Sequence, residues 1–186
     1  MNNSSLMLEI KWYSNCAEWG MVAELLNSLD QELPWLISEE PLLHHFVALR
    51  APAEIFEKVL SAGYSILRHD HISKRSSILE SMFSNYFSIQ EWERIFQAML
   101  AAGADPNGSA ASGERILELA IKKNLPNAVR LLLDFGADPR LMNFFGDESN
   151  SPEELAIQID NDAGRYLLKR VRGPIRQYDR GSGLAI

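Results

Sequence analysis

The fold of this chain is decided by one stretch of sequence, Val129-Arg130-Leu131-Leu132-Leu133-Asp134-Phe135-Gly136-Ala137-Asp138-Pro139. Its ending, Gly-Ala-Asp-Pro, also stands at residues 103–106, which is 33 residues earlier in the chain. A third segment of the same kind closes at Gly63, 40 residues before Gly103. Segments that recur at such a period indicate a repeat protein, in which each unit is one piece of supersecondary structure.

The residues before each of these glycines follow a helical pattern. Residues 128–133 carry apolar side chains at positions i, i+1, i+4 and i+5, and the same spacing recurs in residues 55–60 and 95–100. This spacing places the apolar side chains on one stripe of an α-helix. A glycine after the stripe suits the left-handed conformation in which helices often end. Each unit is therefore predicted to contain a helix that ends at its glycine.

A shorter helix is predicted before each of these helices. In the clearest unit, Arg115-Ile116-Leu117-Glu118-Leu119-Ala120 leads toward Asn124 and Pro126. Asparagine tolerates a left-handed turn, and proline suits the first position of a helix. Pro52 is expected to play the same part before Ile55. Because a helix this short cannot bury its apolar face alone, the units are expected to stack on one another.

The residues of these units resemble the signature of ankyrin repeats, which pairs Gly-x-Thr-Pro-Leu-His-x-Ala with Leu-Leu-x-x-Gly-Ala-Asp. Residues 113–120 read Gly-Glu-Arg-Ile-Leu-Glu-Leu-Ala and depart from the first half at several positions. Residues 132–138 read Leu-Leu-Asp-Phe-Gly-Ala-Asp and match the second half closely. Ser-Pro-Glu-Glu-Leu-Ala at residues 151–156 holds the same place in the next unit, and His45 falls where the family histidine would sit. The resemblance to the ankyrin-repeat family covers residues 38–171.

The resemblance implies an all-α fold, an ankyrin-repeat solenoid of stacked helix-turn-helix units with finger loops. Residues 1–37 are expected to form divergent N-terminal capping helices. Residues 172–186 lack an apolar period and are expected to be a disordered tail. The unit between Gly63 and Gly103 has about seven more residues than the 33-residue unit. We expect this excess near residues 82–88, lengthening the inner helix or its turn.

Composition and charge narrow the class of protein. The formal net charge of −7 disfavours general phosphate binding. Residues 1–66 hold nine acids and three bases, which would steer a basic partner toward this third of the chain. The single cysteine, Cys16, leaves no internal disulfide, and no signal-peptide or transmembrane pattern is found. We expect a cytoplasmic protein that does not act on a membrane.

The titratable residues form no strong catalytic or metal-binding motif. His69 and His71 flank Asp70 in an expected finger loop, but two histidines and one acid are a weak set of ligands. Residues 160–162 (Asp-Asn-Asp) depart from a calcium loop and are interpreted as the start of a helix. No nucleophile motif or nucleotide-binding loop is present. We therefore predict no catalytic residue, no metal and no cofactor, and interpret His45 as a core histidine held by a hydrogen bond.

What the resemblance implies for function is binding of a protein partner by a concave face, lined by finger loops and by the ends of the inner helices. The chain is therefore expected to be a binding protein and not an enzyme, with no small-molecule substrate. The residues predicted to contact the partner are polar or aromatic and lie in these segments. They are Arg50, Arg68, His69, Asp70, His71, Gln90, Asp105, Asn107, Lys122, Lys123, Arg140, Asn143, Phe144 and Gln158.

Several kinds of partner remain open. One hypothesis is a bacterial immunity protein that neutralises a basic toxin or effector by occlusion, with Glu32, Glu39 and Glu40 facing the toxin. Another is a general adaptor or regulatory ankyrin protein. The segment from Arg165 to Arg180 holds six bases and one acid, so nucleic-acid binding through this segment is a weaker alternative.

Overall fold

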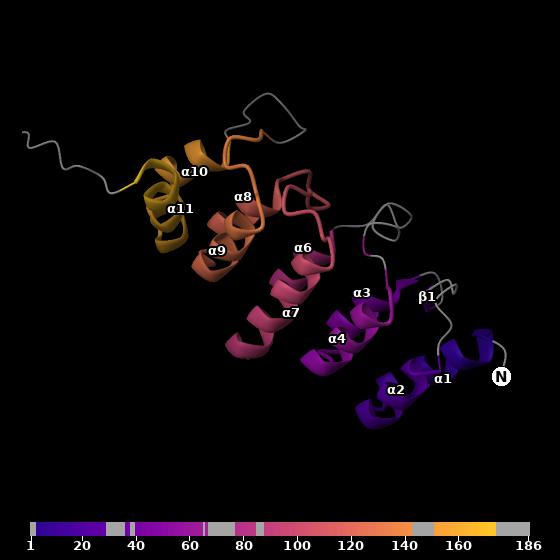
Figure 1. Ribbon diagram of the computed structural model, residues 1–186. Coiled ribbons are helices and arrows are strands. Elements are labelled where there is room, and N and C mark those ends of the chain that lie inside the picture. Colours follow the sequence, from indigo (N-terminus) through magenta and orange to yellow (C-terminus); the bar gives the residue numbers. More distant parts are fainter. Residues whose placement is uncertain are drawn as a thin grey trace, which may run out of the picture.

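The computed structural model describes residues 3–28, 36–37, 40–64, 66, 77–84, 88–142 and 151–173 (Figure 1). Within these ranges the regular structure is α-helical, apart from two antiparallel strands of two residues each, β1 (Leu36–Ile37) and β2 (Glu40–Pro41). The helices in chain order are α1 (Asn3–Asn15), α2 (Trp19–Leu26), α3 (Leu42–Ala48), α4 (Ala53–Ser61), α6 (Ile78–Ser84), α7 (Ile89–Ala101), α8 (Ile116–Lys122), α9 (Pro126–Asp134), α10 (Pro152–Gln158) and α11 (Asp162–Arg172). The predicted α-helical class is confirmed.

These helices pack in two rows, which can be followed along the molecule in Figure 1. The first row consists of α3, α6, α8 and α10, each seven residues long, and each contacts the next. The second row consists of the longer helices α2, α4, α7, α9 and α11, which contact one another in that order. Contacts between α6 and α7, α8 and α9, and α10 and α11 join the two rows.

The apolar stripes form the core between the rows. In α7 the four stripe residues from Ile95 to Leu100 are buried, and in α9 only Leu133 of the stripe is partly exposed. One cluster of buried side chains extends from Leu6 to Leu167. Each longer helix, such as α7 or α9, turns one stripe toward its neighbours and leaves the opposite side to water, so burial of the stripes depends on the packing of successive helices.

The predicted helix ends are confirmed by the backbone. Gly63, Gly103 and Gly136 follow α4, α7 and α9 with φ angles of 95°, 97° and 93°. Asn124 has a φ of 53°, and Pro126 is the first residue of α9. Only glycine adopts these larger positive φ angles without strain, which explains its position after α4, α7 and α9.

The prediction for Pro52 is wrong by one position. Pro52 is the residue that caps α4, with a φ of −59° and a ψ of 152°, and the helix begins at Ala53. The ring of proline fixes φ at a value that serves the cap as well as the first helical position. The left-handed residue of this turn is Arg50, with a φ of 55°, in the place that Asn124 takes between α8 and α9.

The longest unit carries most of its extra residues in the second row, so the expectation of a longer inner helix is wrong. Helix α6 has seven residues, as do the other helices of its row. Helix α7 has 13 residues, whereas α4 and α9 have nine. Four residues therefore extend α7 at its N-terminal end, about one helical turn. Of the other three, one lengthens the turn after α6 and two lie between Gly63 and Ile78.

The two ends of the described chain are helix pairs. Helices α1 and α2 pack against each other, and α1 is joined to α3 by a hydrogen bond of 3.0 Å between Ser14 Oγ and the buried His45 Nε2. The prediction of a hydrogen-bonded core histidine is confirmed. At the other end, Asn161 Oδ1 caps α11 by accepting from Gly164 N at 2.7 Å, which confirms the interpretation of residues 160–162. The disordered tail was predicted to begin at residue 172, but Arg172 is the last residue of α11, and residues 174–186 lie outside the described residues.

A bilayer crossing needs a helix of about 20 largely apolar residues. None of the helices that the structure describes has the length and apolar character for such a crossing.

Candidate partner-binding surface

The loops that precede α8 and α10 begin with the same local structure. Asp105 Oδ1 accepts a hydrogen bond from Asn107 N at 2.9 Å, and Asp138 Oδ1 accepts one from Arg140 N at 2.9 Å. Aspartate favours this turn because its short side chain reaches the backbone two residues ahead. The repeated Gly-Ala-Asp sequence therefore sets the shape of both loops. We call the described residues 104–115 and 137–142 the loop edge.

Asn107 joins the two halves of the loop edge. Its Oδ1 atom accepts from Asp138 N at 2.7 Å, and its Nδ2 atom donates to the Gly136 carbonyl at 3.4 Å. Asn107 was predicted as a partner contact, but its amide is used between successive units and its side chain is only partly exposed. The sequence alone could not distinguish the two roles, because a polar residue in a loop suits either one.

Arg115 is a second link, which the sequence analysis missed. Its Nε atom donates to the Met142 carbonyl at 2.9 Å, and its Nη1 atom donates to the Asn107 carbonyl at 2.9 Å. The guanidinium thus spans both loops with two directed donors. Its own backbone N donates to Glu118 Oε2 at 2.8 Å, which satisfies an amide at the start of α8. The signal was present, since Arg115 and Glu118 stand where the ankyrin signature has threonine and histidine.

The start of α10 has an equivalent arrangement. Ser151 N donates to Glu154 Oε2 at 2.7 Å, and Glu154 N donates to Ser151 Oγ at 3.3 Å. The neighbouring Glu153 accepts from Arg172 Nε at 2.7 Å and from Arg140 Nε at 3.3 Å. The hydrogen bond from Arg172, followed by that from Arg140, holds the pKa of Glu153 below its ordinary value, although partial burial opposes this shift.

Two further predicted residues lie on the first row. Lys122 of α8 forms an ion pair with Glu114, and this hydrogen bond lowers the pKa of Glu114 against the opposing effect of burial. Gln158 of α10 is exposed. Both residues lie on the short helices that follow the loops of the loop edge. Met142, the last described residue of that edge, is 53% exposed.

The structure does not bring all the predicted contact residues to one surface. Arg50 and Lys123 lie in the turns that follow α3 and α8, at the opposite ends of these helices from the loop edge. Gln90 lies in the first turn of α7, because the extra residues lengthen this helix and not α6. Some calls fall outside the described residues, and they are Arg68, His69, Asp70, His71, Asn143 and Phe144, together with Glu32 and Glu39.

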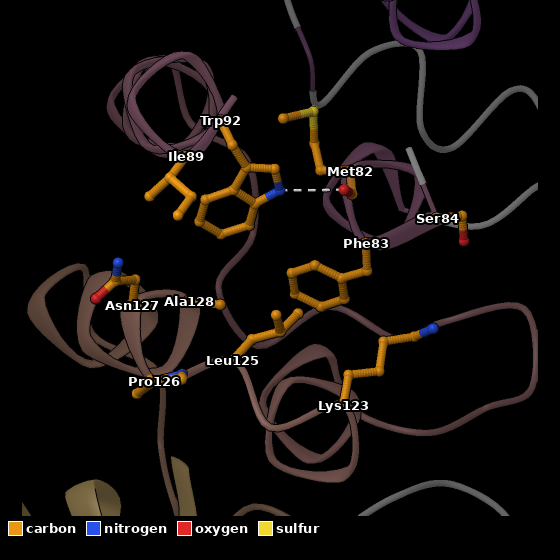
Figure 2. A pocket seen from close by; sticks show the side chains of 10 residues that line it. All are labelled: Met82, Phe83, Ser84, Ile89, Trp92, Lys123, Leu125, Pro126, Asn127 and Ala128. Atoms are coloured by element: carbon orange, nitrogen blue, oxygen red, sulfur yellow. Dashed lines mark hydrogen bonds between the residues drawn. The ribbon is translucent and has the colours of Figure 1, made fainter. Parts of the chain in front are cut away.

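A cleft that was not predicted from the sequence lies at the ends of α6 and α8 that are opposite the loop edge (Figure 2). Its volume is about 610 Å³, and its walls are Met82–Ser84 at the end of α6, Ile89 and Trp92 of α7, and Lys123 with Leu125–Ala128 between α8 and α9. The sequence did contain a sign of this cleft, since the long unit has about seven extra residues. The sequence did not show which helix those residues lengthen.

The arginines of α11 are already engaged with acids. Arg165 pairs with Asp160 at 2.7 Å, Arg170 with Asp134 at 2.6 Å, and Arg172 with Glu153 at 2.7 Å. A phosphate group would have to compete with these carboxylates for the guanidinium groups.

Among the residues that the structure describes, the titratable side chains form no cluster of metal ligands, since no three His, Cys, Asp or Glu side chains come together. Cys16 is exposed at the end of α1, and the buried His45 is bonded to Ser14. What this geometry can do is present a row of ordered loops and an apolar cleft to another molecule. No protein-family model matches the chain, and no curated protein matches its sequence.

Proposed function

We propose that this chain is an ankyrin-repeat protein that binds a protein partner through its loop edge and through exposed residues of the short helices α8 and α10, such as Lys122 and Gln158. The observation that carries the proposal is the link between successive loops. Asn107 and Arg115 join residues of one loop to Gly136, Asp138 and Met142 of the next. Stacked helix pairs with such loops form the extended concave surfaces that repeat proteins use for binding.

The ordering of the loop edge favours recognition of a folded partner. A surface whose backbone is already held by hydrogen bonds loses little conformational entropy on binding. Arg140 and Met142 are exposed at this edge, and both residue types are enriched in protein interfaces. These two side chains and Gln158 are the contacts in the described residues that we expect to contribute most.

A protein partner is better supported than a nucleic acid. The arginines of α11 are paired with carboxylates, and the net charge of the chain is −7. The acidity of residues 1–66 suits a basic partner. A cytoplasmic immunity protein that occludes a basic toxin is one form of the proposal, and an adaptor or regulator is the other. Co-expression with the product of the neighbouring gene tests the first form, which fails if that product is harmless by itself.

The binding surface is tested by a variant, called the loop-edge variant below, with Arg140→Ala and Met142→Ala in the loop edge and Gln158→Ala at the end of α10. Its matched control carries Gln97→Ala and Lys169→Ala, two exposed positions on helices of the second row. The tagged wild-type chain and both variants are used to capture partners from the native host, with mass spectrometry as the readout. The affinity of any captured protein is then measured with purified components.

The expected result is one stoichiometric partner, retained by the wild type and the control, and bound at least about tenfold more weakly by the loop-edge variant. Equal binding by the loop-edge variant and the control would refute the proposed surface. Capture of no protein by the wild type would direct the search toward other ligands.

A further inference from the structure

The cleft in Figure 2 exists because α7 is longer than the helices on either side of it. The stripe of α7 packs between α4 and α9, but its first turn extends beyond the nine residues that each neighbour provides. Ile89 lies in this turn and is 76% exposed. Trp92 is only partly buried. The extension thus leaves apolar side chains that the helices of the second row do not cover.

The wall of the cleft is formed by aromatic rings held in place. Trp92 stacks on Phe96 with ring centroids 4.6 Å apart, and Phe83 stacks on Trp92 at 6.2 Å and on Phe96 at 5.7 Å. The indole Nε1 of Trp92 donates to the Met82 carbonyl at 3.1 Å, the bond drawn in Figure 2. The polar end of the indole is therefore satisfied, and its apolar ring remains part of the wall.

The rim of the cleft is positive. Lys123 is the one charged side chain among the ten lining residues, all of which the structure describes, and it is exposed without an ion pair to a described residue. Helix α9 starts beside it at Pro126 and has no side chain capping its N-terminus. The N-terminus of a helix carries partial positive charge from its first amide groups. An apolar floor next to two positive features favours an apolar group with a carboxylate beside it.

We propose that this cleft is a second docking site, separate from the loop edge, for a peptide segment of a protein partner in which an aromatic or leucine side chain stands next to an aspartate or glutamate. The apolar side chain packs against Trp92, Phe83 and Ile89, and the carboxylate pairs with Lys123. The large exposed fraction of Ile89 shows that the cleft opens at the surface, as a peptide site does, and does not enclose its ligand.

The test uses a phage-displayed library of random peptides, selected on the immobilised full chain. Selected peptides are synthesised, and their affinities are measured for the wild type, Ile89→Lys and Lys123→Glu. Both substituted side chains are exposed, so the variants are expected to fold, and urea unfolding checks that they do. Lys169→Glu on α11 is the matched charge-reversal control away from the cleft. Each peptide is also synthesised with its acid replaced by the corresponding amide.

The expected result is enrichment of peptides that pair a large apolar residue with an acid. Their binding should weaken about tenfold or more in Ile89→Lys and Lys123→Glu, and about tenfold when the acid becomes an amide, while Lys169→Glu binds as the wild type does. Failure to select any peptide, or selected peptides whose binding is unchanged in both cleft variants, would overturn the proposal. Dependence on Ile89 without dependence on Lys123 or on the acid would overturn the assigned chemistry. The loop-edge variant should bind these peptides normally, which separates this proposal from the one above.

Discussion

Gly164 in α11 offers a sharp test of how the last two helices pack. A Cβ atom added at this position would lie 2.9 Å from the Ile159 carbonyl oxygen, 3.1 Å from the Ala156 carbonyl oxygen and 3.2 Å from Asn161 Oδ1. The two carbonyls belong to the backbone at and just after the end of α10 and cannot rotate away. Gly164→Ala therefore requires α11 to move by about half an ångström before the closest contact becomes an ordinary one. That movement would also disturb the hydrogen bond of 2.7 Å from Gly164 N to Asn161 Oδ1.

The magnitude follows from two opposing effects. Alanine is favoured over glycine inside a helix by at most about 1 kcal/mol. Insertion of an extra carbon into a closely packed site costs about 1–3 kcal/mol. We expect Gly164→Ala to lower the free energy of unfolding by about 1–2 kcal/mol. With a urea dependence of about 2 kcal/mol per molar, the unfolding midpoint should fall by about 0.5–1 M.

The assay is urea unfolding of the wild type and the variant, followed by circular dichroism. If the α10–α11 pair unfolds before the rest of the chain, the change is read from the first transition. Gly20→Ala is the matched control, because Gly20 lies in α2 and a Cβ there meets no atom within 4 Å. This control should stabilise the chain by up to about 1 kcal/mol. An unfolding midpoint for Gly164→Ala equal to or above that of the wild type would refute the close approach of the two helices.

Three further predictions concern the loops and helix ends. Glu153→Gln should lower the free energy of unfolding by about 0.5–1 kcal/mol near neutral pH. The pKa of Glu153 in the folded chain lies below its unfolded value near 4.3, so the carboxylate stabilises the fold above that value and the effect disappears as the pH falls through the lower pKa. Urea midpoints of wild type and variant that differ equally at all pH values would contradict this. Arg115→Ala should cost about 1–3 kcal/mol and speed amide hydrogen exchange in residues 104–115, whereas unchanged exchange there would show that the link does not order the loop. Gly136→Ala should lower stability by about 1–2 kcal/mol through its φ of 93° alone, since its Cβ would meet nothing within 4 Å, and a stable variant would show that this φ is not required.

Short-range signals predicted the local structure well. The glycines that end α4, α7 and α9, the left-handed Asn124 and the cap at Asn161 each act on residues a few positions away, so their effects can be read from neighbouring letters. Pro52 was misplaced by one residue because a cap and a first helical position accept the same φ.

The candidate surface was predicted less completely. Asp105 and Arg140 lie in the loops that precede α8 and α10, Gln158 ends α10, and Asn107 links the two loops. Which polar loop residue meets a partner and which joins two units depends on the distance between neighbouring loops, and one sequence does not contain that distance. The predicted contact residues remain predictions, as do the partner class and the ankyrin assignment.

The sequence by itself determined where α4, α7 and α9 end and which apolar stripes hold them together, because these features depend on the conformational preferences and spacing of nearby residues. Only the tertiary structure decided where the excess of the long unit was placed. Because four residues were added to α7 and none to α6, one turn extends past its neighbours and leaves Ile89 and Trp92 beside Lys123. A cleft arises from the difference in length between packed helices, and that difference becomes visible only when the helices lie side by side.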